Sequence, residues 1–164
     1  MTGRKILLVV DVQRDFIDGS LAVPGAEAII PEINGIKNGA DLVYFTLDWH
    51  PKDHCSFKAN GGQWPEHCVH YTLGASLADG LLDGLEEART RDPTKADAQD
   101  LFQPGDVVTV CGIAAEYCVL DTLKNVHLLS GKVGFDVNVF LKGTVGFDST
   151  PLLEWMAGNG VKEY

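Results

Sequence analysis

Short apolar runs recur along the chain, and each is flanked by polar or glycine-rich sequence. The first run, residues 6–10, is too short for a helix, is rich in branched side chains and ends at Asp11. A run of this kind is typical of a strand in a parallel sheet that is covered on both faces. The same pattern predicts further strands over residues 41–47, 107–110 and 137–141, and from residue 161 to the C-terminus.

Longer segments between these runs carry apolar residues at helical spacing. One segment places four isoleucines on a single helical face and is followed by Gly39, a residue that often ends helices. Another places four leucines on one face, and the last begins at Thr150 and Pro151, as helices often do. The predicted helices cover residues 27–38, 76–88, 114–129 and 150–156.

Strands and helices therefore alternate, and this order predicts an α/β fold with a mostly parallel sheet. We expect one domain over residues 1–164, a length sufficient for a full core. Sites in such sheets gather at the carboxyl ends of the strands. Asp11, Asp48 and the segment 112–118 all follow predicted strands. The fold therefore predicts that they converge on one edge.

Aspartate and histidine crowd into the sequence D-W-H-P-K-D-H at residues 48–54 and W-P-E-H-C at residues 64–68. Asp48 and His50, two positions apart at a strand end, point to the same side, and His54 and His67 can return on the following loop. These residue types bind a divalent metal such as zinc, iron or manganese and leave positions open for water or substrate. The alternative is a polar loop whose histidines only form hydrogen bonds.

A second candidate feature is the sequence G-I-A-A-E-Y-C-V at residues 112–119. Cys118 lies in the first turns of a predicted helix, where the helix dipole lowers a thiol pKa and favours the thiolate. Backbone N–H groups at the same place can hold an oxyanion, and Asp11 could take the thiol proton. Alternatively, Cys118 is a small buried apolar residue, and Asp11 is a helix cap or a salt-bridged acid.

The formal net charge is −10, which argues against nucleic acid or an anionic membrane surface as a partner. The sequence has no apolar run of transmembrane length and no signal-peptide pattern, so we expect a cytoplasmic protein. Four cysteines are present, and in that compartment we expect free thiols.

Four sequence blocks, D-V-Q-R-D-F at residues 11–16, the two metal-ligand blocks and the cysteine block, resemble the signature blocks of nicotinamidases. These enzymes belong to the isochorismatase-like cysteine hydrolases. The resemblance implies a three-layer fold with a six-stranded parallel sheet flanked by helices. It also implies hydrolysis of nicotinamide to nicotinate and ammonia in NAD salvage, with pyrazinamide often accepted. We expect a homo-oligomer.

The resemblance also assigns roles to individual residues. It implies that Asp11 is the base, that Cys118 is the nucleophile and that the Ile113–Ala114 peptide is cis. The metal ligands would be Asp48, His50 and His67, with His54 binding directly or through water. The ring of the substrate would lie against Phe16 and Trp64, and the N–H groups of Ala114 and Cys118 would form the oxyanion hole.

The chain departs from the family pattern at the catalytic lysine, which usually precedes a G-x-D-P sequence. Asp92 and Pro93 match the end of that block, so the lysine position falls on Arg89, or its strand is missing from the chain. Lys95 is the nearest lysine but lies six residues late. Because arginine keeps the positive charge with a different geometry, we expect a weak or inactive amidase.

Two other readings of the sequence remain open. The chain could be a catalytically impaired member of the same fold that binds a small ring ligand. It could also be a zinc-stabilised module in which Cys55 and Cys68 join His50 and His67 as ligands.

Overall fold

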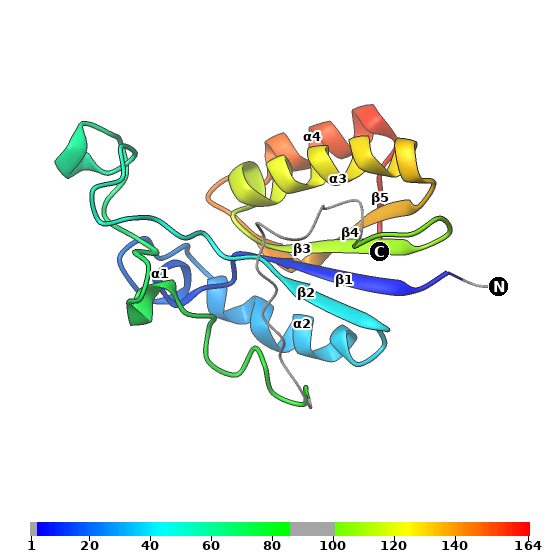
Figure 1. Ribbon diagram of the computed structural model, residues 1–164, viewed down its shortest axis with the longest axis horizontal. Coiled ribbons are helices and arrows are strands. Elements are labelled where there is room, and N and C mark those ends of the chain that lie inside the picture. Colours follow the sequence, from blue (N-terminus) through cyan, green and yellow to red (C-terminus); the bar gives the residue numbers. More distant parts are fainter. Residues whose placement is uncertain (1–2, 86–100) are drawn as a thin grey trace.

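The computed structural model describes residues 3–85 and 101–164, in which five parallel strands form one sheet with the order β2-β1-β3-β4-β5 (Figure 1). The strands are β1 (Lys5–Val10), β2 (Leu42–Phe45), β3 (Val107–Ile113), β4 (Asp136–Val145) and β5 (Lys162–Glu163). The helices are α1 (Arg14–Ile17), α2 (Ile29–Lys37), α3 (Leu120–Val133) and α4 (Thr150–Asn159), with one π-helical turn at Ala115–Val119 and 3₁₀ turns at Ala26–Ala28, Lys58–Asn60 and Leu73–Ala75. None of the helices in this part of the chain has the length and apolar character needed to cross a membrane.

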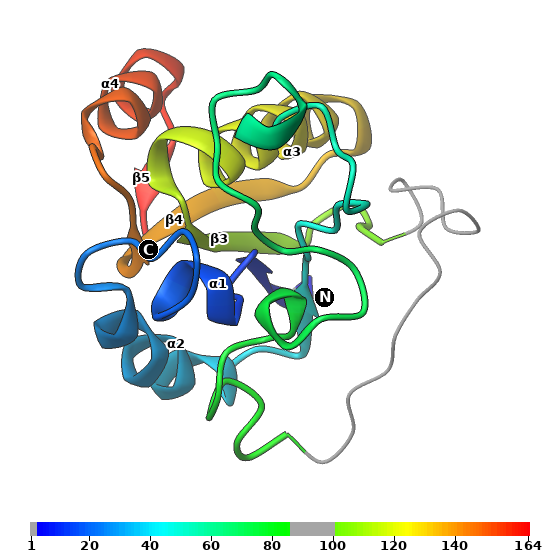
Figure 2. The same cartoon turned by 90° about the vertical axis from the view of Figure 1, so that its left-hand side faces the viewer.

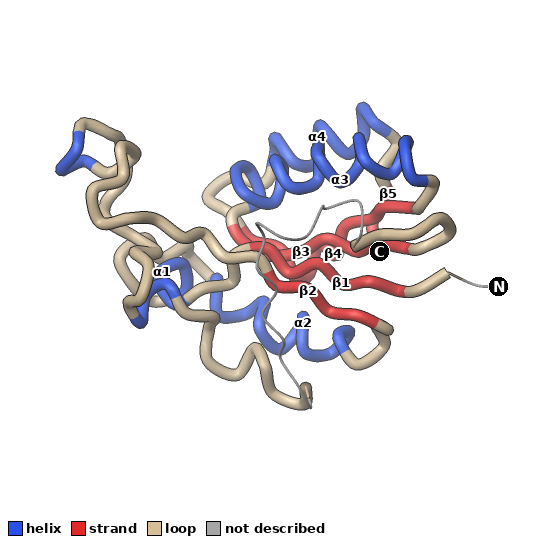
Figure 3. Tube along the Cα trace, in the orientation of Figure 1, coloured by secondary structure: helices blue, strands red, loops and turns tan. Residues whose placement is uncertain are grey.

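Helices cover both faces of the sheet, so the fold has three layers (Figure 3). Helices α3 and α4 cover one face and α2 covers the other. Strand β1 contributes to both cores, because its side chains alternate between the faces. Ile6, Leu8 and Val10 pack on the side of α3 and α4, whereas Leu7 and Val9 pack on the side of α2. The predicted α/β class with a parallel sheet is confirmed.

Strand β1 lies inside the sheet, between β2 and β3. Val9 pairs with Phe45 on one side, and Val10 pairs with Gly112 on the other. Gly112 has a φ of +129°, and a Cβ at this position would lie 2.0 Å from the Val10 carbonyl oxygen. Only glycine permits this close approach. It brings Asp11, at the end of β1, beside the segment that carries Cys118.

The described sheet has five strands, whereas the resemblance implied six. The sixth strand was expected from the lysine block of the family. Arg89 and Lys95, the two candidates for that lysine, lie outside the described residues.

The helix predicted over residues 76–88 is wrong for its described part, residues 76–85, which form a series of turns. Gly80 and Gly84 have φ values of +76° and +79°, and each follows an aspartate. Asp-Gly pairs favour left-handed turns and interrupt a helix even where leucines keep helical spacing. Leu81 is fully buried here, but Leu82 is 38% exposed, so the leucines do not form one buried face.

Asp106, in the turn before β3, accepts four hydrogen bonds and ties that turn to the start of β1. The Arg4 guanidinium donates to it at 2.6 Å and 3.1 Å, and the main-chain N–H groups of Arg4 and Gln103 donate at 3.1 Å and 2.7 Å. The side chain of Asp106 is only 2% exposed. The Arg4 side chain, as the largest cause, holds the pKa of Asp106 below its usual range.

We expect Asp106→Asn to lower the free energy of unfolding by about 1–3 kcal/mol at neutral pH, because the amide leaves donors without a partner. Folding lowers the pKa of this carboxyl, so its ionised form stabilises the folded protein at a pH above the unfolded-state pKa. This contribution is lost as the pH falls through the folded-state pKa. The difference from the original chain should therefore shrink in acid. Urea unfolding at neutral pH and in acid measures the difference in free energy of unfolding. Asp121→Asn is the control, since Asp121 is exposed. An equal difference in acid would contradict the assignment.

Candidate active site

The segment that follows β2 extends away from the carboxyl edge of the sheet before the chain returns to it (Figure 1). Figure 2 faces this edge, with α1 lying in front of the strand ends. The predicted site residues Asp11, Asp48 and Cys118 all belong to this edge, because each follows the end of a strand.

Asp11 ends β1 in a left-handed conformation, with a φ of +50°, and is 7% exposed. The Thr46 hydroxyl donates to its Oδ1 at 2.6 Å, and the main-chain N–H of Asp11 donates to the Thr46 hydroxyl oxygen at 3.2 Å. Burial raises the pKa of Asp11 by more than the hydrogen bonds from Thr46 and Cys118 lower it. A carboxylate with a raised pKa is a better proton acceptor than an exposed one, as a general base requires.

Cys118 lies in the π-helical turn Ala115–Val119 and is half-buried. Burial, followed by the charge of Asp11 and the hydrogen bond to it, raises the pKa of the thiol. The sequence predicted a lowered pKa at a helix start, and that expectation is wrong. Desolvation and a facing carboxylate outweigh the helix dipole here and favour the thiol form of Cys118.

The chain bends sharply just before Cys118. The Ile113–Ala114 peptide is cis, as the resemblance implies. The Ala114 carbonyl accepts from the N–H groups of Tyr117 and Val119, both at 3.1 Å. This turn wraps the main chain around the thiol and places Ala114 on the wall of the same cavity as Cys118.

Asp48, His50 and His67 come together at the base of the excursion after β2. Each offers a ligand atom, and these atoms all lie within 4.8 Å of one another. His50 Nε2 lies 2.7 Å from Asp48 Oδ1, and His67 Nε2 lies 3.3 Å from Asp48 Oδ2. His67 Nδ1 lies 2.7 Å from the Pro65 carbonyl oxygen and so must carry its proton, which leaves Nε2 free to bind. One carboxylate and two imidazoles fit a divalent metal such as zinc.

The ionisation of Asp48 and His50 suits a cation. Burial raises the pKa of Asp48, but hydrogen bonds and charge from His67 and His50 outweigh it, so the pKa is lowered overall. Burial lowers the pKa of His50, which favours the neutral imidazole that binds metals. Burial also disfavours charge on His67, but hydrogen bonds to Asp48 and to the Pro65 carbonyl raise its pKa. The carboxylate is therefore anionic and faces two ring nitrogens.

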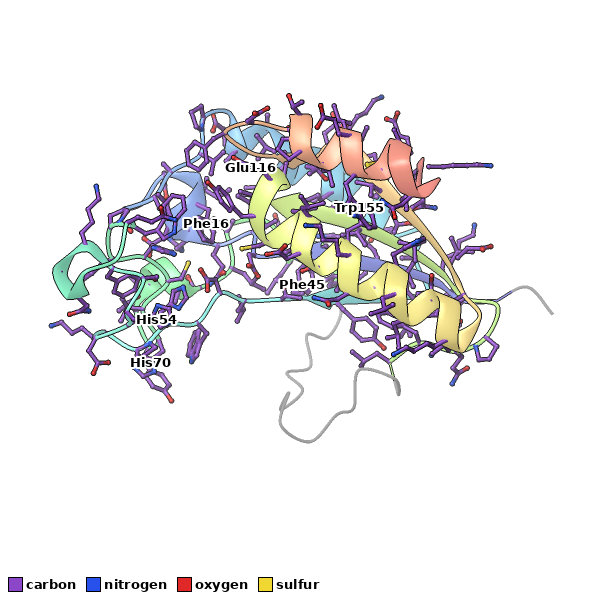
Figure 4. The ribbon with its side chains drawn as sticks, turned by 90° about the horizontal axis from the view of Figure 1, so that it is seen from above. Phe16, Phe45, His54, His70, Glu116 and Trp155 are labelled. Atoms are coloured by element: carbon purple, nitrogen blue, oxygen red, sulfur yellow. The ribbon has the colours of Figure 1, made fainter. Side chains whose placement is uncertain are left out.

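His54 lies beside this group of three but does not belong to it. Its ring stacks on that of His50 with centroids 4.1 Å apart, and its Nδ1 lies 2.7 Å from the Ser56 hydroxyl. Phe57, which is fully buried, packs edge-on against the rings of His50, His54 and His67. Figure 4 shows His54 and Phe16 near the same end of the molecule, with His70 further out.

The described residues do not support a zinc module with cysteine ligands. All four cysteines are free thiols, as expected; Cys55 is exposed, and the cluster of possible ligands contains no cysteine.

One cavity of about 250 Å³ joins the cysteine to the histidines. The structure places Phe16, Trp64 and Ala114 on its wall, together with Cys118 and the four candidate metal residues. Asp11 is not among the lining residues but is hydrogen-bonded to Cys118. Sequence reasoning missed the remaining wall residues, which are Leu21, Val23, Ser56, Tyr117 and Phe147. Tyr117 was adjacent to the predicted nucleophile, and its ring packs edge-on against Trp64 at 5.3 Å.

Glu116 was also missed, although it lies within the cysteine block (Figure 4). Its Oε1 accepts from the main-chain N–H groups of Phe147 and Asp148, at 3.0 Å and 3.1 Å. A Cβ on Gly146 would lie 2.1 Å from Glu116 Oε2, so the loop after β4 packs tightly here. Glu116 thereby holds Phe147 at the cavity wall.

This topology is that of the isochorismatase-like hydrolases. No family model matches the chain. The nicotinamidase/pyrazinamidase of Mycobacterium tuberculosis is 34% identical over 144 residues, which cover 74% of this chain and 77% of the relative. The pyrazinamidase of Pyrococcus horikoshii, solved in complex with zinc, is 32% identical, covers 98% of each chain and has a TM-score of 0.74. The L. infantum protein PnC1, solved in complex with nicotinate, is 30% identical over 100% of this chain and 95% of its own, with a TM-score of 0.79.

The chain therefore belongs to the nicotinamidase/pyrazinamidase family.

Proposed function

We propose that the chain hydrolyses nicotinamide to nicotinate and ammonia and that it also accepts pyrazinamide. The observation that carries this proposal is that one cavity is lined both by Cys118, paired with Asp11, and by the cluster of Asp48, His50 and His67. A cavity of about 250 Å³ suits a single aromatic ring with one amide group. The names of the relatives support the same substrates.

In the proposed complex the substrate ring lies between Phe16 and Trp64, with its amide carbon towards Cys118. Asp48, His50 and His67 would hold a divalent metal. When bound, the metal would supply a Lewis acid facing the ring nitrogen. Phe16 also packs against the ring of His67, with centroids 5.6 Å apart, so the aromatic wall and the ligand set are in direct contact. In the proposed complex, this contact fixes the plane of the substrate ring relative to the Cys118 thiol.

Cleavage begins when Asp11 accepts the Cys118 proton and the thiolate sulfur bonds to the amide carbon. The carbonyl electron pair moves onto oxygen, where the N–H groups of Ala114 and Cys118 stabilise the charge. The protonated Asp11 then gives its proton to the leaving nitrogen, the carbon–nitrogen bond breaks and ammonia departs. The carbonyl forms again in a thioester on Cys118. Asp11 next takes a proton from water, and the hydroxide attacks the thioester carbon and displaces the Cys118 thiolate. Asp11 returns the proton to this sulfur, and the nicotinic acid leaves and ionises to nicotinate.

Comparison of nicotinamide with benzamide tests the role of the ring nitrogen. We expect benzamide to give a kcat/KM lower by roughly 10²-fold or more, because an interaction with a metal ion is worth several kcal/mol. Ammonia release at matched concentrations measures both substrates, and pyrazinamide, which keeps a ring nitrogen, is the control. Equal kcat/KM values for benzamide and nicotinamide would contradict this role.

A second candidate function is binding of the ring without efficient cleavage. The sequence favours it, because the lysine position of the family's catalytic block falls on Arg89 in this chain. Without that lysine we expect kcat to be lower by about 10²–10³, by analogy with loss of an oxyanion-hole donor. Calorimetric titration with nicotinamide, beside ammonia assays of the original chain, Arg89→Lys and Lys95→Ala, separates the two functions. Binding without ammonia release would favour the second candidate.

A further inference from the structure

The loop between β1 and α1 contacts the candidate metal site through a residue to which the proposed mechanism gives no role. Gln13 is fully buried. Its Oε1 accepts from the main-chain N–H of Asp48 at 2.7 Å, and its Nε2 donates to the Asp48 carbonyl oxygen at 2.9 Å. The same Nε2 donates to the Ala75 carbonyl oxygen at 2.7 Å. One side chain thus holds both main-chain polar groups of Asp48 and uses both of its own N–H donors.

Asp15, two residues later, binds the segment that carries His67, the second ligand segment. Its Oδ2 accepts from the main-chain N–H of Cys68 at 2.7 Å, directly after His67 in the sequence. Cys68 has a φ of +46°, a left-handed conformation that is uncommon for a residue with a side chain. A Cβ on Gly74 would lie 2.2 Å from the same carboxylate oxygen, so Asp15 is packed closely in place.

The two ligand segments are also joined to each other. The main-chain N–H of His50 donates to the Cys68 carbonyl oxygen at 2.9 Å, and the N–H of His70 donates to the His50 carbonyl oxygen at 2.9 Å. The segments therefore form a pair, with Gln13 bound to one and Asp15 bound to the other. The positions of the Asp48 and His67 ligand atoms depend on both contacts.

We propose that Gln13 and Asp15 are positioning residues that fix the separation of the Asp48 and His67 ligand atoms before a metal arrives. Only an amide of this length offers one acceptor and two donors to the groups around Gln13. Groups outside the ligand set that orient the ligands typically change metal affinity by 10–100-fold. This inference rests on the metal-dependent function proposed above.

Zinc titration of the metal-free full-length chain against a chromophoric chelator tests the proposal. We expect Gln13→Met, which keeps the length but removes the hydrogen bonds, and Asp15→Ala to weaken zinc binding by roughly 10–100-fold. Asp15→Asn keeps an acceptor for the Cys68 N–H and should bind nearly as the original chain does. Arg14→Gln is the matched control, because Arg14 lies between the two residues but its side chain pairs with Asp79 at the surface.

Thermal melts of the metal-free proteins separate positioning from a general effect on stability. A purely structural role would lower the melting temperature while the folded protein kept its zinc affinity and its cobalt(II) absorption spectrum. We expect the affinity to fall and the cobalt spectrum to change in protein that is folded at the temperature of titration. If Gln13→Met does not fold, Gln13→Glu, which keeps only the acceptor, replaces it beside Asp15→Ala.

We expect the zinc affinity to fall by roughly 10–100-fold in the folded Gln13 and Asp15→Ala variants. Affinities within about twofold of the original chain would overturn the inference, while the proposed function would stand. Failure of the original chain to bind zinc would overturn both.

Discussion

Replacement of Cys118 by alanine is expected to lower the kcat for nicotinamide by a factor on the order of 10⁴ or more, as loss of a covalent nucleophile does in other hydrolases. The reason is that Cys118 is the only thiol among the described residues that line the cavity. The half-buried side chain is replaced by a smaller apolar one, so folding and zinc content should be unchanged. Ammonia release, zinc analysis and a thermal melt measure the three quantities.

Cys55→Ser is the matched control, because Cys55 is an exposed free thiol that does not line the cavity. It should keep the turnover of the original chain. Trapping of the acyl-enzyme by rapid acid quench and mass spectrometry gives a second measurement, with the added mass expected on Cys118 alone. Turnover near that of the original chain in Cys118→Ala would rule out the covalent mechanism.

Removal of a metal ligand should have the next largest effect. We expect His67→Ala to abolish zinc retention and to lower kcat/KM for nicotinamide by about 10²–10³, since a metal contact with the substrate is worth several kcal/mol. His67 is 5% exposed, and its Nε2 lies 3.3 Å from Asp48 Oδ2, so removal of its ring takes one of the two nitrogen ligand atoms from the cluster. Elemental analysis and steady-state kinetics on the same preparation measure both effects.

His70→Ala is the control for this experiment. His70 lies three residues further along the same loop and packs on Trp49 and Tyr71, outside the ligand set. Its replacement should leave zinc content and kcat/KM unchanged. If His67→Ala retained stoichiometric zinc, the ligand set would have to be another one.

The sequence predicted the parallel sheet well because β1 and β3 are short buried runs that are rich in branched apolar residues. Strand β1 and helix α2 lie within a residue or two of the predicted ranges. Strand β4 runs on to Val145, beyond the predicted end at residue 141, because the apolar run breaks at Lys142 while the pairing with β3 continues. A pattern of side chains does not report where main-chain pairing stops.

The helix predicted over residues 76–88 failed for a different reason. Leucine spacing predicted a helix, but two Asp-Gly pairs impose left-handed turns within that same stretch. Local backbone preference prevailed over hydrophobic periodicity, because a segment with few buried side chains gains little from forming a helix.

At the site, residue types predicted that Asp48, His50 and His67 come together and that Asp11 lies beside Cys118, but not the environment of these groups. The raised pKa of Cys118 depends on burial and on the distance to a carboxylate from another strand, which only the fold sets. Gln13 and Asp15 stand within the D-V-Q-R-D-F block, but the sequence predicted no role for them, because they bind main-chain atoms of segments that are distant in the sequence.

The excursion between β2 and the 3₁₀ turn Leu73–Ala75 carries the metal-ligand residues, whereas Asp11 and Cys118 follow the two central strands β1 and β3. In the proposed function, the residues that would hold the metal and the residues that cleave the bond are therefore encoded on separate stretches of the gene. Exchange of one excursion for another would leave the paired central strands untouched. The fold can in this way acquire new substrates by loop replacement while its bond-breaking chemistry stays the same.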